Sequence, residues 1–253
     1  MNKIILITGA TSGFGKATAI KFAQQGNNLI ITGRREDLLN ELTKKLIDKY
    51  NIDVLPLNFD VRKLGEVKKA IESLPEKWTH IDVLVNNAGL AVGLNPIHEG
   101  VVDDWERMID TNIKGLLYMT HFVAPLMVTR KQGHIINIGS IAGKEVYAKG
   151  NVYCGSKFAV DAITKGTRID LLPYNIKVTQ IAPGASDTEF SVVRFKGDQE
   201  MADNVYKGYK PLNPSDVAEA IYYVTTLPEH VNINDLVIMP TAQASSIYFH
   251  KTM

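Results

Sequence analysis

The stretch KIILITGATSGFGK at residues 3–16 joins a short apolar run to a glycine-rich turn and to the start of a segment with helical periodicity. The run at 3–7 is typical of a buried strand, and the periodicity predicts a helix that begins near Lys16. Glycines let the backbone of such a turn approach a phosphate closely, and the first N–H groups of the helix then point at it. The turn therefore predicts a pyrophosphate site formed by Gly9, Thr11, Ser12, Gly13, Phe14 and Gly15.

The glycine spacing in this turn, G-x-x-x-G-x-G, differs from the usual dinucleotide-binding pattern G-x-G-x-x-G. A turn whose glycines serve only the backbone is the alternative. The context favours binding, because the motif follows the first predicted strand, opens a helix and lies in a strand–helix–strand unit.

The rest of the chain alternates between two kinds of segment. Short runs rich in Ile and Val predict strands at 4–7, 29–31, 54–57, 81–85, 134–138, 177–181 and 236–239. Their near-continuous apolar character is typical of strands that are covered on both faces. Between these runs lie segments with helical periodicity, which predict helices at 16–25, 36–50, 64–73, 102–130, 152–171 and 214–226. This order predicts a single α/β domain over 1–253 with a doubly wound, Rossmann-like, mostly parallel sheet of seven strands. Ligands of such sheets bind beyond the carboxyl ends of the strands.

One segment, 185–213, interrupts this alternation with a polar, mixed composition and no predicted strand. Because it follows a strand end, where the ligand site is expected, we interpret it as a mobile lid over the substrate. A surface excursion without a role is the alternative.

The composition excludes several classes of protein. With 253 residues, 45% hydrophobic and 22% charged, the chain is typical of a soluble globular protein, and its net charge of +1 attracts neither nucleic acid nor an anionic membrane. A single cysteine, Cys154, excludes an intrachain disulfide and is interpreted as a packing residue. No secretory signal, no apolar run of roughly 20 residues and no metal-ligand spacing of histidines is present. We therefore expect a cytoplasmic protein without a membrane partner, a nucleic-acid partner or a metal.

Two arginines, Arg34 and Arg35, follow the second predicted strand, where a carboxylate commonly binds the adenosine ribose. Guanidinium groups suit a 2′-phosphate, which predicts NADP(H) over NAD. A solvated pair is the alternative, although cations at a helix start oppose the helix dipole. The strand ends nearby are expected to line the adenosine, with Asp60 at the adenine amino group, or to hold the strands in register: Asp60, Val61, Asn87, Ala88 and Gly89. For Asn86 we expect the structural role.

Tyr153 and Lys157 stand four residues apart in the predicted helix, so their side chains share one face of it. Ser140 follows the fifth predicted strand at the same edge of the sheet and is suited to hydrogen-bond a substrate oxygen. A phenol with the usual pKa of about 10 is a weak base near neutrality, but a nearby ammonium and an oxidised nicotinamide both favour the phenolate. We expect Tyr153 to act as general acid or base, with Lys157 lowering its pKa and also holding the ribose hydroxyls.

Taken together, the motifs at 8–15, 86–89 and 153–157, with Asn112, Ser140, Pro183, Gly184 and Thr188, resemble the short-chain dehydrogenase/reductase family over essentially the whole chain. The resemblance implies hydride transfer between a nicotinamide and a carbonyl/alcohol pair, with a catalytic tetrad of Asn112, Ser140, Tyr153 and Lys157. It implies that Asn112 holds a water that links Lys157 to solvent. It also implies a homotetramer, with the Tyr153 helix at one interface, and contacts to the nicotinamide amide from Pro183, Gly184 and Thr188.

Further stretches at 33–35, 86–92, 151–153, 188–198 and 227–234 resemble the NADP-dependent 3-hydroxy acid dehydrogenases, which act on serine, L-allo-threonine and related acids and reduce malonic semialdehyde. The stretch 184–187 departs from that pattern, being shorter and more acidic. The resemblance implies a small 3-hydroxy acid as substrate. A 3-oxoacyl thioester reductase or broad carbonyl reductase is the alternative within the family, disfavoured by dispersed basic residues. A nucleotide-sensing module without catalysis is disfavoured by the complete tetrad.

A carboxylate substrate needs a cationic partner near the reacting carbon. Arg194 and Lys196 are the candidates, because a cation that closes onto the carboxylate orients the substrate and excludes water. A solvated or interfacial salt bridge is the alternative for each. The tail at 245–253, with Tyr248 and Phe249, is apolar, and we expect it to pack against a second subunit.

Overall fold

The computed structural model describes residues 2–252 and contains a seven-stranded sheet in which every neighbouring pair of strands is parallel. In the order β3-β2-β1-β4-β5-β6-β7, the first strand lies in the middle of the sheet. The chain adds β2 and β3 on one side of β1 and then crosses over to add β4 to β7 on the other side. All seven predicted strands are confirmed, and the sheet is parallel throughout. Met1 and Met253, part of the predicted domain, lie outside the described residues. The strands are β1 (Ile4–Ile7), β2 (Asn28–Gly33), β3 (Val54–Asn58), β4 (Ile81–Asn86), β5 (Gly133–Ile138), β6 (Ile176–Pro183) and β7 (Asp235–Ile238).

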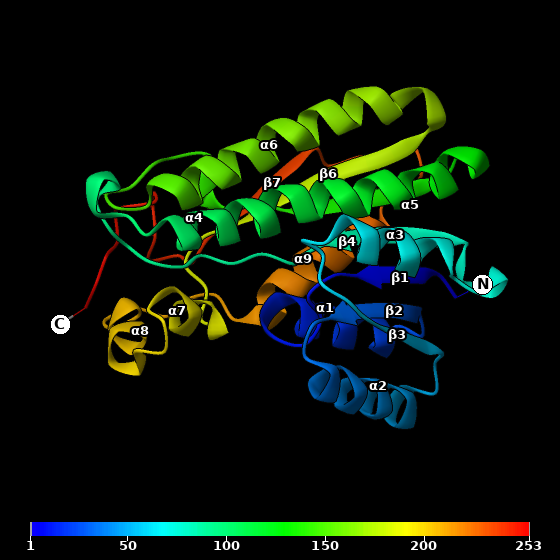
Figure 1. Ribbon diagram of the computed structural model, residues 1–253, viewed down its shortest axis with the longest axis horizontal. Helices are drawn as coiled ribbons and strands as arrows, with labels where there is room; N and C mark the ends of the chain where they lie inside the picture. Colours follow the sequence, from blue (N-terminus) through cyan, green and yellow to red (C-terminus); the bar gives the residue numbers. More distant parts are fainter. Residues whose placement is uncertain (1, 253) are drawn as a thin grey trace.

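Helices cover both faces of the sheet, which is why its strands are apolar on both sides (Figure 1). Along β1, Ile5 and Ile7 lie in one cluster of buried side chains with Phe22, while Leu6 lies in a second cluster with Met119. Helices α1, α2 and α9 pack on the first face, and α3, α5 and α6 on the second. The helices are α1 (Gly13–Gln24), α2 (Glu36–Tyr50), α3 (Leu64–Glu72), α4 (Val102–Ile109), α5 (Leu116–Arg130), α6 (Asn151–Leu171), α7 (Glu189–Arg194), α8 (Gln199–Val205) and α9 (Pro214–Thr226).

Two of the predicted helices differ from those in the structure, one in its first residue and one in its continuity. Helix α1 begins at Gly13, not near Lys16, because the last two glycines of the turn already form its first turn, with Ser12 as the N-cap. The predicted helix 102–130 is interrupted by a π-helical segment, Asp110–Gly115, that separates α4 from α5. A π-helical turn widens the helix locally and often marks a functional site. Here it contains Asn112.

The segment 185–213 forms two short helices, α7 and α8, and its two ends are paired with each other by a parallel bridge between Ser186 and Leu212. Figure 1 shows both helices beside the main body, at the end of the molecule where the C-terminal tail also lies. The tail meets this segment directly, since the backbone N–H of Thr252 donates to the carbonyl of Gly208 at 2.8 Å. Over residues 2–252, no helix is long and apolar enough to cross a membrane.

Candidate active site

A cavity of about 590 Å³ extends along the carboxyl ends of the strands, from the glycine-rich turn after β1 to the residues after β5 and β6. Of the catalytic and cofactor-binding residues predicted from the sequence, only Gly15 and Asn112 do not line it. The predicted residues that do are Gly9, Thr11, Ser12, Gly13, Phe14, Arg34, Arg35, Asp60, Val61, Asn87, Ala88, Gly89, Ser140, Tyr153, Lys157, Pro183, Gly184 and Thr188. Residues from the ends of six strands, β1 to β6, thus meet in one continuous space.

The glycine-rich turn presents a bare helix N-terminus to this cavity. Ser12 is extended and makes no side-chain capping bond, so the first N–H groups of α1 have no partner from its hydroxyl. Gly9 and Gly13 have positive φ angles of 65° and 50°, which favour glycine. Gly15 has another role: a Cβ there would lie 2.3 Å from the carbonyl oxygen of Gly9. The turn therefore needs glycine at all three positions and suits a phosphate group.

The two arginines after β2 lie at the cavity with different partners. Arg35 donates to the hydroxyl of Thr11 at 3.0 Å and pairs with Glu189 at 3.1 Å. Arg34 lies 3.7 Å from the carboxylate of Asp60. Both guanidinium groups are about half exposed, at 55% and 47% of the side chain, so they keep N–H groups available for a further anion.

Asp60 binds Arg62 in a two-point contact, at 2.9 Å from Nε and 2.6 Å from Nη2. Burial opposes ionisation of this carboxyl, but the hydrogen bonds and charge of Arg62 hold its pKa below the usual range. The carboxylate is therefore already engaged, and a bond to an adenine amino group would have to use its remaining acceptor capacity. It also follows β3 by two residues instead of ending it.

The polar residues at the end of β4 connect neighbouring elements. Asn86 donates to Thr120 at 3.0 Å and to Asn137 at 2.9 Å, and all three are buried. Asn87 donates to the carbonyls of Thr8 and Gly9 at 2.8 and 3.1 Å. The side chain of Asn87 thus holds the glycine-rich turn against β4, and the residue also lines the cavity.

Ser140, Tyr153 and Lys157 come together at the far end of the cavity. Ser140 follows β5, and its hydroxyl accepts from the backbone N–H of Ala142 at 3.1 Å. The other two residues lie one turn apart on α6, as the sequence predicts. Lys157 is 7% exposed and donates to the carbonyl of Ile138 at 2.8 Å. The three side chains thus combine a hydroxyl, a phenol and an amine at one wall.

Burial acts on the protonation of two members of this group. Burial raises the pKa of the Tyr153 hydroxyl, against the opposing effects of the Arg194 charge and the Ser140 hydroxyl. Burial also lowers the pKa of Lys157 to about 8. Without ligands, the loss of hydration therefore outweighs the effects of Arg194 and Ser140 on Tyr153. The expected lowering of the Tyr153 pKa by Lys157 together with an oxidised nicotinamide stays a prediction.

Asn112 is buried behind the cavity wall, and protein partners occupy both donors of its side-chain amide. Its amide group exchanges two hydrogen bonds of 2.8 Å with the backbone of Leu90 and donates to Ser156 at 3.0 Å. Both Nδ2 hydrogens are used, so a water linked to Asn112 could not be held by its amide donor. Gly89 separates the Asn112 side chain from Lys157: a Cβ there would lie 3.3 Å from Oδ1 and 3.7 Å from Nζ.

The structure separates the two cations proposed for a substrate carboxylate. Lys196 does not line the cavity and pairs with Asp104 at 2.7 Å. Arg194 lines the cavity and donates to the hydroxyl of Tyr147 at 2.8 Å. Cys154 is buried, in agreement with the predicted packing role. Over the described residues, no group of three His, Cys, Asp or Glu side chains could hold a metal.

Sequence reasoning missed three contributors, Tyr147, Gln243 and Phe249, all of which line the cavity. Buried Gln243 accepts from the backbone N–H of Ala185 at 2.7 Å. Phe249 packs on Tyr209 of the same chain, with ring centres 5.1 Å apart, while Tyr248 is 70% exposed, and the packing of the tail on a second subunit stays a prediction. The unusual apolar character of the tail was the available signal, but it does not reveal which surface the tail covers.

Comparison with known proteins agrees with this geometry. Residues 3–199 match the family model for short chain dehydrogenase. The chain is 51% identical over 242 residues, 95% of its length and 96% of the relative's, to the NADP-dependent 3-hydroxy acid dehydrogenase YdfG of Shigella flexneri. It is 46% identical over 249 residues, 98% of both chains, to sulfoacetaldehyde reductase 2 of Chromohalobacter salexigens. The closed form of serine dehydrogenase complexed with NADP+ superposes with a TM-score of 0.91 at 49% identity, covering 98% of this chain and 100% of that one. The chain therefore belongs to the short-chain dehydrogenase family.

Proposed function

We propose that the protein is an NADP-dependent oxidoreductase that interconverts the hydroxyl and carbonyl forms of a small 3-hydroxy acid. The observation that carries this proposal is the single cavity that joins a bare helix N-terminus, two arginines and the Ser140–Tyr153–Lys157 group. The names of relatives about half identical over nearly the whole chain support the same reaction and cofactor.

NADP fits the residues of this cavity. The N–H groups at the start of α1 suit the pyrophosphate, and glycine at position 13 has no side chain to stand between them and the cavity. Arg34 and Arg35 would hold the 2′-phosphate with charge-assisted bonds. The strand-end residues Asp60, Val61, Ala88 and Gly89 would line the adenosine and ribose, and Pro183, Gly184 and Thr188 the nicotinamide. When bound, NADP accepts or supplies the hydride.

Tyr153 moves the proton in this proposal. In the oxidative direction its phenolic oxygen takes the proton of the substrate hydroxyl as the hydride leaves the same carbon, and in reduction it returns the proton. The Ser140 hydroxyl donates to the substrate oxygen and orients it. Lys157 has a pKa of about 8, so it can change its charge near the working pH and hold the ribose hydroxyls. Asn112 supports this wall through Leu90 and Ser156.

The segment 185–213 acts as the lid of this site. Its helix α7 brings Thr188, Phe190 and Arg194 to the cavity, and Tyr206 follows from the end of α8. Closure of such a segment excludes water from the reacting groups. The short bridge between Ser186 and Leu212 marks the two ends about which it would move.

The enzyme assembles as a homotetramer in the cytoplasm. Apolar side chains on the outward faces of α5 and α6 support the assembly: Leu117 and Phe158 are each 41% exposed, and Ile169 is 72% exposed. Contiguous exposed apolar residues on a soluble enzyme usually mark a protein interface. Sedimentation velocity of the purified protein tests the assembly, and a single species with the mass of one chain would contradict it.

A second candidate substrate class, short sulfonated aldehydes, is favoured by the 46% identity to a sulfoacetaldehyde reductase over 98% of both chains. It shares with a 3-hydroxy acid an anionic group close to the reacting carbon. A 3-oxoacyl thioester reductase or broad carbonyl reductase stays the alternative within the family. A nucleotide-sensing module without catalysis would leave Ser140, Tyr153 and Lys157 without a role.

Nicotinamide absorbance with the purified enzyme tests the proposal. NADP+ and NAD+ are offered separately with serine, L-allo-threonine, 3-hydroxyisobutyrate and 3-hydroxybutyrate, and NADPH is offered with sulfoacetaldehyde and a 3-oxoacyl thioester. We expect turnover with NADP+ and at least one of the hydroxy acids. Oxidation of NADPH by sulfoacetaldehyde or the thioester alone would overturn the substrate class, and silence in every arm would overturn the enzymatic function.

A further inference from the structure

Ser140 begins a short turn whose other end is held by a cluster of charged side chains. The turn is the 3₁₀ helix η4 (Ile141–Gly143), with Ser140 as its N-cap and Lys144 as its C-cap. The carbonyl of Ser140 accepts from the backbone N–H of Gly143 at 2.9 Å, and the carbonyl of Ile141 accepts from that of Lys144 at 2.9 Å. Ser140 and Lys144 are thus the two ends of one hydrogen-bonded unit, so a restraint on Lys144 also restrains Ser140.

Lys144 bridges two carboxylates that belong to different elements. Its ammonium group donates to Asp161 on α6 and to Asp235 at the start of β7. Gln180 of β6 donates to both carboxylates, at 3.0 Å to Asp161 and 3.2 Å to Asp235. The side chains of Lys144 and Asp161 are 22% and 14% exposed, so solvent screens this bridge less than an exposed ion pair. The bridge therefore fixes the end of η4 to one helix and two strands.

The cluster keeps its charges despite partial burial. Burial opposes the charge of Lys144, but the hydrogen bonds to its two carboxylates raise its pKa above the usual value. Burial likewise opposes ionisation of Asp161, but hydrogen bonds from Lys144, Lys165 and Gln180 hold its pKa below the usual range. Lys165 donates to Asp161 at 2.5 Å from the same helix. Two cations thus balance the carboxylates of Asp161 and Asp235, and the bridge persists through the neutral pH range.

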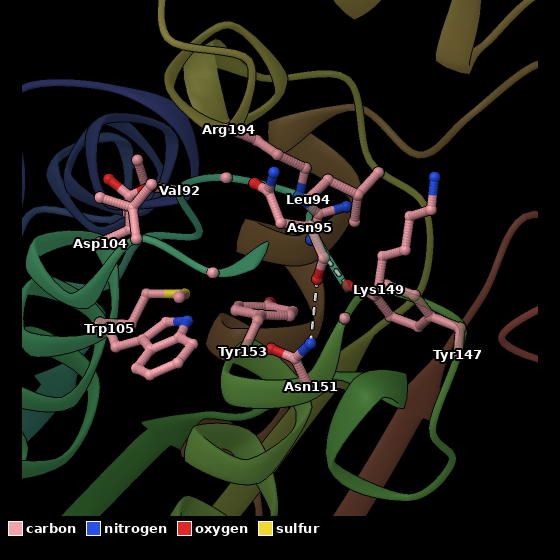
Figure 2. A pocket seen from close by; sticks show the side chains of 15 residues that line it. Val92, Leu94, Asn95, Asp104, Trp105, Tyr147, Lys149, Asn151, Tyr153 and Arg194 are labelled. Carbon is pink, nitrogen blue, oxygen red and sulfur yellow. Dashed lines mark hydrogen bonds between the residues drawn. The ribbon is translucent and has the colours of Figure 1, made fainter. Parts of the chain in front are cut away.

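The turn η4 packs closely on α6 beside Lys157. A Cβ at Gly143 would lie 2.6 Å from the backbone carbonyl oxygen of Lys157, so no side chain separates the turn from the helix. Figure 2 shows that Tyr147 and Tyr153, further along the same stretch of chain, line a small pocket that shares both residues with the main cavity. A shift of η4 along α6 would therefore move Ser140 relative to Tyr153.

We propose that Lys144 is a positioning residue for the reaction, because its bridge to Asp161 and Asp235 fixes the turn that places the Ser140 hydroxyl. This inference rests on the proposed function and assigns a role to a residue that does not line the cavity. Groups that stabilise a transition state must be held within about 0.5 Å of the productive geometry. Without the bridge, Ser140 would occupy a wider range of positions, which lowers kcat more than it raises KM.

Lys144 could instead stabilise the fold without acting on Ser140. Both interpretations predict that its removal lowers stability, so denaturation does not separate them. They differ in whether the effect of Lys144 on turnover requires the Ser140 hydroxyl. In a double-mutant cycle, two residues that act through one contact are non-additive, whereas two independent residues are additive.

The experiment measures kcat and KM for oxidation of the best hydroxy acid by NADP+ in the wild type, Lys144→Met, Ser140→Ala and the double variant. We expect Lys144→Met to lower kcat by about tenfold and to change KM by less than about twofold. In the Ser140→Ala background the same substitution should lower kcat by less than about twofold. Equal losses of kcat in the two backgrounds would overturn the inference.

Three further variants accompany the cycle. Lys144→Arg can still bridge two carboxylates and should restore most of the lost kcat. Asp235→Asn keeps Lys144 paired with Asp161 and should lower kcat in the same direction by a smaller factor. Lys165→Gln is the matched control, because it removes an ammonium group from the same Asp161 carboxylate without releasing η4. The control should turn over like the wild type.

Hydrogen–deuterium exchange separates this inference from the proposed function, because it needs no turnover. The N–H groups of Gly143 and Lys144 are protected by the bonds within the turn. We expect exchange at these two amides to be about tenfold faster or more in Lys144→Met and unchanged in Lys165→Gln. Unchanged exchange in Lys144→Met would overturn the inference whatever the activity.

Two combined results distinguish the two claims. If the wild type turns over no substrate, yet exchange in the turn is faster in Lys144→Met, the proposed function fails and the anchoring of Ser140 stands. If the wild type oxidises hydroxy acids and Lys144→Met changes neither kcat nor exchange, the function stands and the role of Lys144 fails.

Discussion

The amine nitrogen of Lys157 lies 6.0 Å from the centre of the Tyr153 ring and is hydrogen-bonded to the carbonyl of Ile138. The two titratable groups therefore share one wall of the cavity without a strong direct bond between them. Burial lowers the pKa of Lys157 to about 8 and raises that of Tyr153, so both groups are driven toward their neutral forms. Burial thus disfavours charge at this wall, and Lys157 lowers the stability of the folded protein wherever it stays protonated.

This cost predicts a pH-dependent effect of the Lys157→Met substitution on stability. The pKa of Lys157 is about 8 in the folded protein and 10.5 ordinarily, so the unfolded chain binds the extra proton between these values. Folding is therefore opposed most below pH 8, and this opposition disappears as the pH rises toward 10.5. We expect Lys157→Met to be more stable than the wild type by roughly 1–3 kcal/mol at pH 7. The difference should shrink by roughly 2 kcal/mol at pH 9.5.

Urea denaturation at the two pH values measures this difference. The raised pKa of Tyr153 acts in the opposite direction, because its contribution is lost only as the pH passes the folded value above 10. Measurements at or below pH 9.5 therefore report Lys157. A stability difference that does not vary with pH would show that Lys157 is not held as a buried amine.

We predict that Arg34 and Arg35, the arginines after β2, make the protein prefer NADPH to NADH. The double variant Arg34→Ala and Arg35→Ala removes the cations that would bind a 2′-phosphate, which NADH lacks. Charge-assisted hydrogen bonds contribute about 1.5–3 kcal/mol each, so NADPH affinity should fall by roughly 10- to 100-fold for each arginine, and NADH affinity by little. Fluorescence titration of both cofactors measures the effect. Equal losses for NADPH and NADH would leave the cofactor preference without this explanation.

From the ion pair between Arg35 and Glu189 we predict that a substitution of Glu189 increases the affinity for NADPH. Glu189 lies 3.1 Å from Arg35 and competes for the guanidinium that would hold the 2′-phosphate. Both side chains are about half exposed, at 47% and 58%, so the pair itself contributes little to stability. Glu189→Gln should tighten NADPH binding by a few-fold at low ionic strength and leave NADH binding unchanged. Weaker NADPH binding would show that the pair supports the bound state instead.

We predict that a substitution of Asn86 lowers the stability of the protein without affecting its chemistry. Its amide donates to Thr120 and Asn137 inside the core between β4, α5 and β5. Asn86→Leu leaves both acceptors buried without a donor, so we expect a loss of roughly 2–4 kcal/mol in the free energy of unfolding. NADPH affinity at low temperature should stay near the wild-type value. A variant as stable as the wild type would mean that the amide network contributes nothing.

The fold could be predicted from the sequence because its signals are local. Buried parallel strands are continuous apolar runs, and Ile5, Leu6 and Ile7 must be apolar because they alternate between two hydrophobic clusters. The pairing of Tyr153 with Lys157 is equally local, since four residues are about one helical turn. These features follow from the periodicity of a helix or a strand, without knowledge of the tertiary structure.

The rest of the site depends on contacts between distant parts of the chain. The π-helical turn at Asn112 accompanies bonds to Leu90, a residue 22 positions earlier, and the apolar periodicity through this region shows no sign of it. Gln243 reaches the cavity from the C-terminal tail. The different partners of Arg194 and Lys196 likewise depend on how the end of α7 rests on the body. No spacing rule connects such residues.

Hydride transfer by the wild-type enzyme and by Tyr153→Phe tests the central claim most directly. Nicotinamide absorbance is followed with NADP+ and the best hydroxy acid, and NADPH affinity is measured for both proteins by titration. The substitution removes only the hydroxyl that would carry the proton, so NADPH should bind within about twofold of the wild type while kcat falls by roughly a thousandfold. Turnover of Tyr153→Phe at a rate close to that of the wild type would contradict the role of Tyr153 and, with it, the mechanism proposed for this site.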